Sequence, residues 1–179
     1  MSDMTDRKQG AQRLIAAARL EFNEKGFEGT HTNAIARRAG FAPQTFYRHF
    51  ADKLAIFLAV YRLWAEEENE ALSSATSPDQ MVDVLLRHHA SHRLFRRALR
   101  YLTNREAEVA RVRAHSRQSQ MAAAMARFPA LDPTKALLLI LTLERLSDGL
   151  IEGEIEACGI SAAATRAAMV DLLEKARLG

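Results

Sequence analysis

Apolar residues recur every three or four positions along most of the chain, and this helical period constrains the fold more than any other feature. Leu14, Ala18 and Phe22 form such a stripe near the start. No alternating run of Val, Ile, Thr and Tyr bounded by turn residues interrupts the pattern, so strands are not expected. Alanine, leucine, arginine and glutamate dominate instead, and all four favour helices. We therefore predict an all-α fold.

Glycine, proline and capping residues divide this pattern into separate helices. Gly26 ends the first helix, Gly40 supplies a turn, and Pro43 stands at the start of a short helix. Capping candidates are Thr30-His31-Thr32, Asp52 and Ser161. The predicted helices span residues 7–25, 32–39, 44–50, 53–70, 79–90, 91–103, 105–127, 133–153 and 161–177.

The chain divides into a small N-terminal part and a larger C-terminal part. Small and polar residues gather at 73–78, as in a linker, and the helix before them joins the two parts. We expect a three-helix domain at 1–53 and a helical domain at 54–179. Residues 1–53 hold nine Lys and Arg against six Asp and Glu, whereas the rest holds sixteen of each. The net charge of +3 therefore lies in the first part, which favours a polyanionic partner.

Composition also bears on the compartment. Cys158 is the single cysteine, so no intramolecular disulfide can form, and a reducing cytoplasm is expected. The segment Met1 to Asp6 is polar and acidic and does not read as a signal peptide. The longest apolar run, 136–143, is too short to span a bilayer, so no membrane partner is expected.

The segment Thr32 to Phe50 carries the clearest functional pattern. Two short helices joined by a glycine turn describe a helix-turn-helix, whose second helix enters the major groove of DNA. The early residues of that helix meet base edges, and the donors that follow them hold phosphates. We predict base contacts from Pro43, Gln44 and Thr45, and phosphate contacts from Tyr47, His49 and Lys53. The alternative is that Tyr47 and His49 are packing residues of an ordinary helical pair.

Residues 10–58 also resemble the N-terminal domain of the tetracycline-repressor (TetR) family. Several residue types coincide at fixed offsets: Ala16-Ala17-Ala18, Leu20-Glu21-Phe22, Lys25-Gly26-Phe27, Thr32, Ile35-Ala36, Ala39-Gly40, Thr45, Phe46-Tyr47-Arg48-His49-Phe50, Lys53 and Leu54. The resemblance implies that Thr32 and Asn33 open the motif near the DNA backbone. It also implies a homodimer whose C-terminal domain binds a small molecule, which changes the spacing of the DNA-binding domains. Gln44 stands where the family often has a small residue, so the operator sequence is not predicted.

The C-terminal part carries broad apolar surfaces. Helices 133–153 and 161–177 present more apolar residues than a small core needs, which favours a four-helix contact in a homodimer, although the same residues could fill the monomer core. A mostly apolar ligand is expected, and each candidate for its pocket could equally be plain core. These candidates are Trp64, Phe95, Tyr101, Met121, Met125 and Phe128, with Leu85 and Leu102 beside them.

Charged residues of the C-terminal part leave several interpretations open. Glu144, Asp148 and Glu152 lie one turn apart, and we expect a solvated stripe rather than buried pairs or a polar end of the pocket. The nine arginines within 87–117 are expected to pair with the acidic segment 132–174, with an anionic effector as the alternative. His88 and His92 are also one turn apart, but no third metal ligand is evident. Neither a metal nor a cofactor is expected.

These features favour a transcriptional regulator over other classes. No glycine-rich phosphate loop or nucleophile elbow is present, and Cys158 has no identifiable base partner, so an enzyme is not expected. A helical adaptor without DNA binding is the alternative function. We predict a DNA-binding regulator, of repressor type, that binds a palindromic operator as a homodimer and is released by a small molecule.

Overall fold

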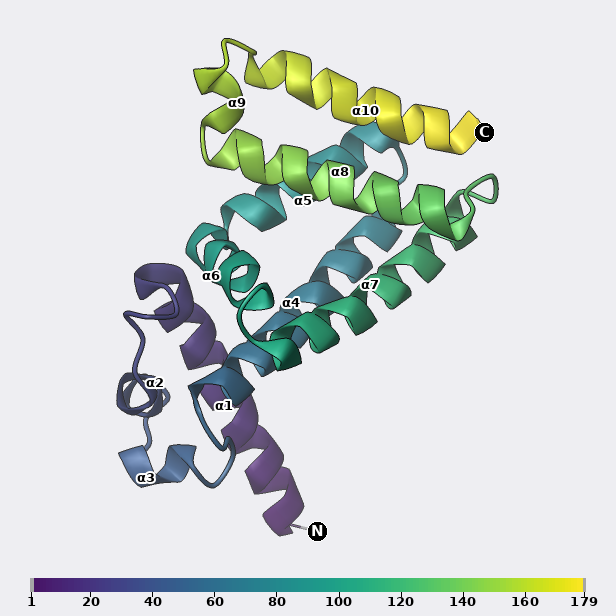
Figure 1. The fold of residues 1–179 in the computed structure, drawn as a ribbon. Helices are drawn as coiled ribbons and strands as arrows, with labels where there is room; N and C mark the ends of the chain where they lie inside the picture. Colours follow the sequence, from purple (N-terminus) through teal and green to yellow (C-terminus); the bar gives the residue numbers. More distant parts are fainter. Residues whose placement is uncertain (1, 179) are drawn as a thin grey trace. The chain divides into compact units, whose positions relative to one another are not determined.

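The computed structural model describes residues 2–178, with side chains from Arg7 onward (Figure 1). The described residues form helices joined by short turns and contain no strand, which confirms the predicted all-α fold. Met1 and Gly179, the outer limits of the two predicted domains, lie outside the described residues, as do the side chains of Ser2 to Asp6. None of the described helices is long and apolar enough to cross a bilayer.

The chain folds into two compact units, which are described separately. Unit 1 comprises Met1–Trp64 and Leu94–Ala110, and unit 2 comprises Ala65–Arg93 and Arg111–Gly179. One boundary falls within a long helix and another within the helix that follows residue 106. Compactness does not assign function, so the predicted division at residues 53 and 54 into DNA-binding and effector domains stays a prediction.

Unit 1 is built on the first helices of the chain. They are α1 (Ser2–Lys25), α2 (Thr32–Arg38), α3 (Pro43–Phe46), the first half of α4 (Lys53–Ser74) and most of α6 (Arg93–Thr103). The helix α2 contacts both α1 and α3. Leu14, Phe22, Ile35 and Phe46 are fully buried, so the apolar stripe of α1 packs under the other two helices as its period predicts.

Aromatic rings extend this core along the start of α4. The ring of Phe57 lies 5.2 Å from those of Phe22 and Phe27, edge to face in both cases, and 4.8 Å from that of Phe95 on α6. Edge-to-face rings at such distances attract one another beyond the area they bury. The end of α1, the start of α4 and α6 are therefore held together around one side chain.

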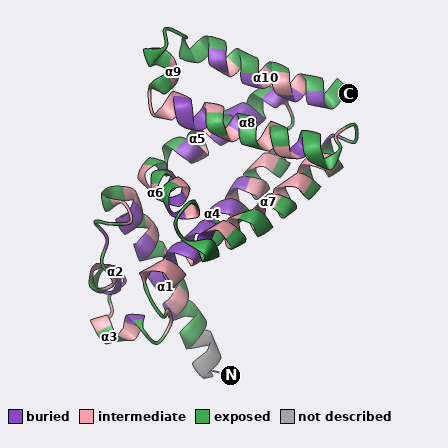
Figure 2. Ribbon diagram, viewed as in Figure 1, coloured by how far each residue is buried: buried purple, intermediate pink, exposed green. Residues whose placement is uncertain are grey.

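Unit 2 is a helical bundle with its own core. It contains α5 (Pro78–Ala90), most of α7 (Ala107–Arg127), α8 (Pro133–Ile151), α9 (Glu154–Ala157) and α10 (Ala162–Leu178), together with the end of α4. The helices α5, α8 and α10 contact one another pairwise. Val82, Leu143, Met169 and Leu173 lie at the centre of this core, and Figure 2 shows buried and exposed residues alternating along α8 and α10.

The predicted boundaries are mostly right, and two of the three predicted caps are confirmed. The Asp52 carboxylate accepts a hydrogen bond from the amide of Ala55 at 2.8 Å, and the Ser161 hydroxyl accepts one from Ala164 at 3.1 Å. The cap predicted for α2 is wrong. His31 makes no capping side-chain bond there. The buried Thr30 hydroxyl instead donates to the carbonyls of Glu21 and Gly26, at 3.1 and 2.7 Å.

Two helices differ from the predicted pattern. The helix α3 ends at Phe46 and not at Phe50, because the amides of Arg48 and His49 bond three residues back, to the carbonyls of Thr45 and Phe46. Such bonds wind the last turn more tightly than an α-helix. The short α9 was not predicted, since four residues are too few to show a period.

Candidate nucleic-acid interface

The turn between α2 and α3 fixes the angle of the helix-turn-helix. Gly40 has a φ of +75°, a conformation that side chains with a Cβ rarely adopt. The guanidinium of Arg13, on α1, donates to the carbonyl of Ala39 at 2.7 Å and lies 4.4 Å over the ring of Phe41. A Cβ at position 40 would come within 2.9 Å of that guanidinium. The turn therefore depends both on glycine and on a cation from α1.

A second contact from α1 supports the segment that follows α3. Gly10 is buried, and a Cβ there would lie 2.9 Å from the His49 ring, so α1 and His49 approach closely. The His49 ring also stacks against Phe41 at 6.5 Å. Arg7 donates to the carbonyl of Arg48 at 3.4 Å. Arg7, Gly10 and Arg13 share one face of α1, which thus holds both ends of α3.

The residues predicted to read bases lie on α3 itself. Gln44 is exposed, Pro43 and Thr45 are half-buried, and Phe46 is fully buried beneath them. The buried ring anchors α3, while the amide of Gln44 is open to solvent. An exposed glutamine amide can donate to and accept from an adenine edge at once. The structure is thus compatible with base reading by Gln44.

The Tyr47 hydroxyl and the start of α2 lie together. Tyr47 is 58% exposed, and its hydroxyl shares a hydrogen bond with that of Thr32 at 3.2 Å. Asn33, the next residue of α2, is exposed. The Thr32 and Tyr47 side chains therefore orient each other, and Asn33 is open to solvent beside Thr32. Hydroxyl and amide groups of this kind donate to phosphate oxygens.

Lys53 and His49 are predicted to contact phosphates, but both also make contacts within the fold. The Lys53 ammonium donates to the carbonyl of Phe27 at 2.8 Å and lies 4.3 Å over the Phe27 ring. It thereby ties the start of α4 to the turn after α1. An ammonium has three donors, so this bond leaves others for a phosphate. His49 is half-buried through its contact with α1. Both residues therefore have a packing role beside any contact with DNA.

Charge pairs hold α2 against α1. Both guanidinium nitrogens Nη1 and Nη2 of Arg38 bind the Glu24 carboxylate, at 2.8 and 2.6 Å, and its Nε lies 3.0 Å from Glu21. The hydrogen bond from Arg38 lowers the pKa of Glu24 below its ordinary value. The sequence pattern did not single out Arg38, Arg13 or Gly10, because their partners lie 14 to 39 residues away.

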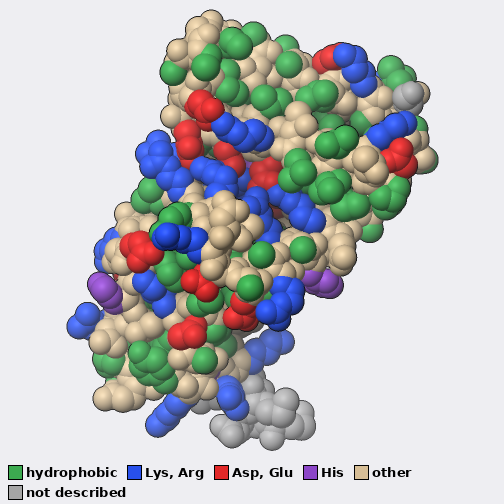
Figure 3. All heavy atoms as spheres, in the orientation of Figure 1, with side chains coloured by type: hydrophobic (Ala, Val, Ile, Leu, Met, Phe, Trp, Pro, Cys, Tyr) green, Lys and Arg blue, Asp and Glu red, His purple; other side chains and the backbone are tan. Residues whose placement is uncertain are grey.

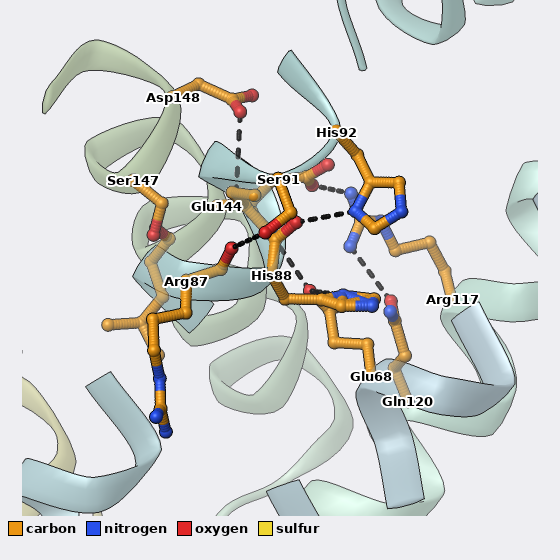
Figure 4. Close-up of polar contacts among 12 residues, drawn as sticks. Glu68, Arg87, His88, Ser91, His92, Arg117, Gln120, Glu144, Ser147 and Asp148 are labelled. Carbon is orange, nitrogen blue, oxygen red and sulfur yellow. Dashed lines mark hydrogen bonds and ion pairs between the residues drawn. The ribbon is translucent and has the colours of Figure 1, made fainter. Parts of the chain in front are cut away.

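Unit 2 contains a buried polar cluster at the junction of α4, α5 and α8 (Figure 4). The Nε2 of His89 donates to Glu68 at 2.9 Å, and its Nδ1 lies 3.5 Å from a carboxylate oxygen of Asp148. Glu68 and Asp148 are 4% and 5% exposed, respectively. Asp148 therefore does not belong to a solvated stripe, contrary to the prediction, because a histidine on a facing helix partners it. Burial lowers the pKa of the neighbouring His88 to about 4.

The predicted pairing of arginines with the acidic segment is confirmed on α7. Arg113 binds Glu144 at 2.7 Å, and Arg117 contacts the same carboxylate. One arginine within the acidic segment pairs with an earlier helix: Arg166 on α10 binds Asp79 and Asp83 of α5, at 2.9 and 2.8 Å. Among the described residues, no group of three His, Cys, Asp or Glu side chains is placed to hold a metal ion.

The predicted ligand residues are spread over both units. In unit 1, Trp64 and Phe95 are buried with ring centroids 6.5 Å apart, and Tyr101 is 48% exposed beside Arg105. In unit 2, Met121 and Met125 are half-buried on α7, and Phe128 lies in the core. A groove of about 340 Å³ in unit 2 is lined by other residues: Ala130, Leu131, Lys135, Leu138, Leu139, Thr142, Leu172, Lys175 and Ala176. The ligand assignment stays a prediction.

The geometry of α1 to α3 defines a class of protein, namely one that carries a helix-turn-helix domain on a helical body. Comparison with known proteins gives the family. Residues 14–60 match the family described as bacterial regulatory proteins, tetR family. The N-terminal part of the chain is therefore similar to that of TetR-family transcriptional regulators.

Individual proteins are similar to parts or all of the chain. The chain is 39% identical over 49 residues to an uncharacterized HTH-type transcriptional regulator, YdgC, of Bacillus subtilis. That match spans 27% of the chain and 25% of the length of the relative. A crystal structure of a TetR-family regulator from Rhodococcus sp. matches 95% of the chain and 99% of its own, with a TM-score of 0.72 and 19% identity. Salmonella enterica GusR matches 93% and 96%, with a TM-score of 0.67 and 21% identity. The structural likenesses show the fold.

Proposed function

We propose that the protein represses transcription by binding a palindromic operator as a homodimer, and that a small, mostly apolar molecule releases it. The observation that carries this proposal is the surface of α3. Gln44 is exposed there over a fully buried Phe46, and the Tyr47 hydroxyl is held by Thr32. A short, well-anchored helix with an exposed reader and flanking donors is what entry into the major groove requires.

The proposed contacts fall into two groups. Gln44 and Thr45, with Pro43 shaping the start of α3, read base edges. The other group, which contacts phosphates, comprises Thr32, Asn33, Tyr47, His49 and Lys53. Contacts to phosphate position the protein, whereas contacts to base edges carry the sequence preference.

The experiment that tests the proposal separates these groups. The parent protein, Tyr47→Ala and Gln44→Ala are each used to select binding sequences from a pool of random DNA duplexes, and their affinities for the selected duplex are measured. Tyr47→Ala is expected to weaken binding to all duplexes alike, and Gln44→Ala to change the selected sequence. Arg111→Ala, an exposed site in unit 2, is the control. If both variants select and bind as the parent does, the interface is not on α3.

The homodimer is supported by the outer faces of α8 and α10. Leu138 and Leu141 are 58% and 43% exposed on α8, and small alanines are exposed on α10, at 164, 167 and 168. Figure 3 shows hydrophobic side chains over these two helices. Some residues of the predicted dimer surface, such as Leu143 and Met169, are buried in unit 2 instead. The proposed contact therefore uses the outer residues only.

Mass in solution tests the dimer. Leu138→Glu with Leu141→Glu is expected to shift the protein from dimer to monomer in sedimentation, because it places four carboxylates in a self-complementary contact. Leu20→Glu changes a side chain of similar exposure on α1 and is expected to leave the mass unchanged. A parent protein that sediments as a monomer at micromolar concentration excludes the dimer.

The proposed effector can be identified from the molecules that remain bound to the purified protein. The half-buried Met121 and Met125 lie on α7, and methionine adapts to ligands of varied shape. Trp64 is the single tryptophan, so its fluorescence reports on one place in the chain. We expect mass spectrometry of the purified protein to find an apolar molecule that changes Trp64 emission and lowers DNA affinity. A compound that changes neither is not the effector.

A further inference from the structure

Two basic residues of α1 precede the matched family segment, and one of them contacts the proposed interface. Arg7 and Lys8 are exposed, and the family match begins at residue 14. The Arg7 guanidinium donates to the carbonyl of Arg48 at 3.4 Å. Arg48 lies between Tyr47 and His49, which are both proposed phosphate contacts. The N-terminal turns of α1 therefore continue the surface formed by the end of the helix-turn-helix.

The local charge on this surface suits a polyanion. The bond that Arg7 makes with Arg48 goes to a backbone carbonyl, so both guanidinium groups keep their charge, and the Arg48 side chain is exposed as well. A guanidinium has five N–H donors, of which this bond uses one. Figure 3 shows Lys and Arg side chains on unit 1 where the first described turns of α1 lie. Adjacent cations at an exposed site repel one another, and a phosphate between them removes that repulsion.

The position of Gly10 on α1 determines how closely this helix approaches the segment after α3. Gly10 brings α1 within van der Waals contact of His49, one turn after Arg7. The same contact fixes how far the helix stands from the segment after α3. Lys8, next to Arg7 on the following face, is exposed.

We propose that Arg7 and Lys8 bind phosphates of the DNA backbone flanking each half-site, with Arg7 held in place by the carbonyl of Arg48. This inference rests on the proposed DNA binding by α3. It extends the interface to a part of α1 that the family match does not include.

Salt dependence of binding tests the inference without knowledge of the operator. The probe is a fluorescein-labelled 30-base-pair duplex of mixed sequence, and anisotropy gives its affinity between 50 and 200 mM salt. Each phosphate contact contributes about −0.9 to the slope of log affinity against log salt. Arg7→Ala with Lys8→Ala is expected to reduce the slope by about 1.8 per bound protomer. The parent should therefore lose roughly tenfold more affinity per protomer than the variant over this range, which is roughly a hundredfold for a dimer.

Matched substitutions separate a phosphate contact from a structural one. Arg7→Lys keeps the charge and should keep the parent slope, whereas Arg7→Gln keeps a donor for the Arg48 carbonyl and should lose about 0.9 of it. If Arg7→Gln keeps the parent slope, or if Arg7→Lys loses as much as Arg7→Ala, the residue acts through packing and the inference is wrong. Arg111→Ala is the control and should retain the parent slope.

Failure of this inference and failure of the proposed function are distinguishable. If Tyr47→Ala weakens duplex binding while the double variant keeps the parent slope, DNA binding by α3 stands and the α1 contact is excluded. If the parent binds this duplex with no salt dependence, the proposed function fails as well.

Discussion

The helix-turn-helix of unit 1 and the junction of α4, α5 and α8 in unit 2 treat polar side chains in opposite ways. In unit 1 the polar residues of the helix-turn-helix remain at the surface: Gln44 and Asn33 are exposed, and Tyr47 is 58% exposed. At the junction in unit 2 polar side chains are buried, with Glu68 and Asp148 at 4% and 5% exposed on either side of His89. Both arrangements use hydrogen bonds, but one leaves donors free for a partner and the other uses them inside the fold.

The difference predicts how each region responds to substitution. Surface donors such as those of Tyr47 and Gln44 add little to the stability of the fold and can be exchanged without unfolding it. Buried charges need every partner, because each was removed from water. Substitutions in the interface of unit 1 should therefore change binding, and substitutions in the cluster of unit 2 should change stability.

The largest effect on stability is expected from removing Glu68. Glu68→Ala leaves His89 with one of its two carboxylate partners and creates a cavity beside it. Loss of one partner of a buried pair lowers the free energy of unfolding by about 3–5 kcal/mol. Urea denaturation followed by circular dichroism measures the change.

Two variants sharpen the Glu68 result. Glu66→Ala removes an exposed carboxylate from the same helix and is expected to change the free energy of unfolding by less than about 0.5 kcal/mol. Glu68→Gln keeps an oxygen that accepts from His89 and should fall between the two. Equal effects of Glu66→Ala and Glu68→Ala would show that the cluster contributes nothing to stability.

Acid should destabilise the cluster through His88. Burial lowers its pKa to about 4, below the ordinary value of 6.5, so between these pH values only the unfolded chain binds this proton. The free energy of unfolding is therefore highest above about pH 6.5 and decreases as the pH falls to about 4. The free energy of unfolding should drop by up to about 1.4 kcal/mol per pH unit in that window.

A matched pair of variants assigns that pH dependence. His88→Gln stays neutral and should flatten the curve between pH 4 and 6.5, measured by urea denaturation at each pH. His115→Gln, an exposed histidine of the same unit, should leave the parent curve unchanged. A parent and a His88→Gln variant with parallel curves would place the titrating group elsewhere.

Sequence reasoning succeeded where the signal is local. The turn at Gly40, the caps at Asp52 and Ser161, and most helix boundaries follow from residues within four positions of each other. The exposed Gln44 follows equally from its place at the start of a short helix. All of these follow from the helical spacing of apolar residues and from the glycine, proline and capping residues between helices.

Contacts between distant residues were not predictable in this way. Glu68 and Asp148 are 80 positions apart, yet both face His89, and an acidic residue at helical spacing looks the same whether it is solvated or buried. Arg13 likewise reaches the Ala39 carbonyl 26 residues away. Such partners depend on how the helices pack together, and the spacing of apolar residues within one helix does not determine that packing.

Two glycines with the same backbone conformation measure what the α1 contact adds to unit 1. Gly40 and Gly159 have φ values of +75° and +79°, so alanine at either position meets a backbone cost of about 1–2 kcal/mol. Only at Gly40 does a Cβ meet a neighbour, the Arg13 guanidinium at 2.9 Å, whereas nothing lies within 4 Å at Gly159. Gly40→Ala should therefore lower the free energy of unfolding by about 1 kcal/mol more than Gly159→Ala.

An Arg13→Ala background isolates the cause of that difference. With the guanidinium absent, Gly40→Ala should cost the same as Gly159→Ala, since only the backbone term remains. DNA affinity separates the two sites further, because Gly40 sets the angle of α3 and Gly159 lies in the turn between α9 and α10. Gly40→Ala is expected to weaken duplex binding, with Gly159→Ala unchanged. If the two glycines respond alike in stability with Arg13 present, the cation from α1 does not support the turn.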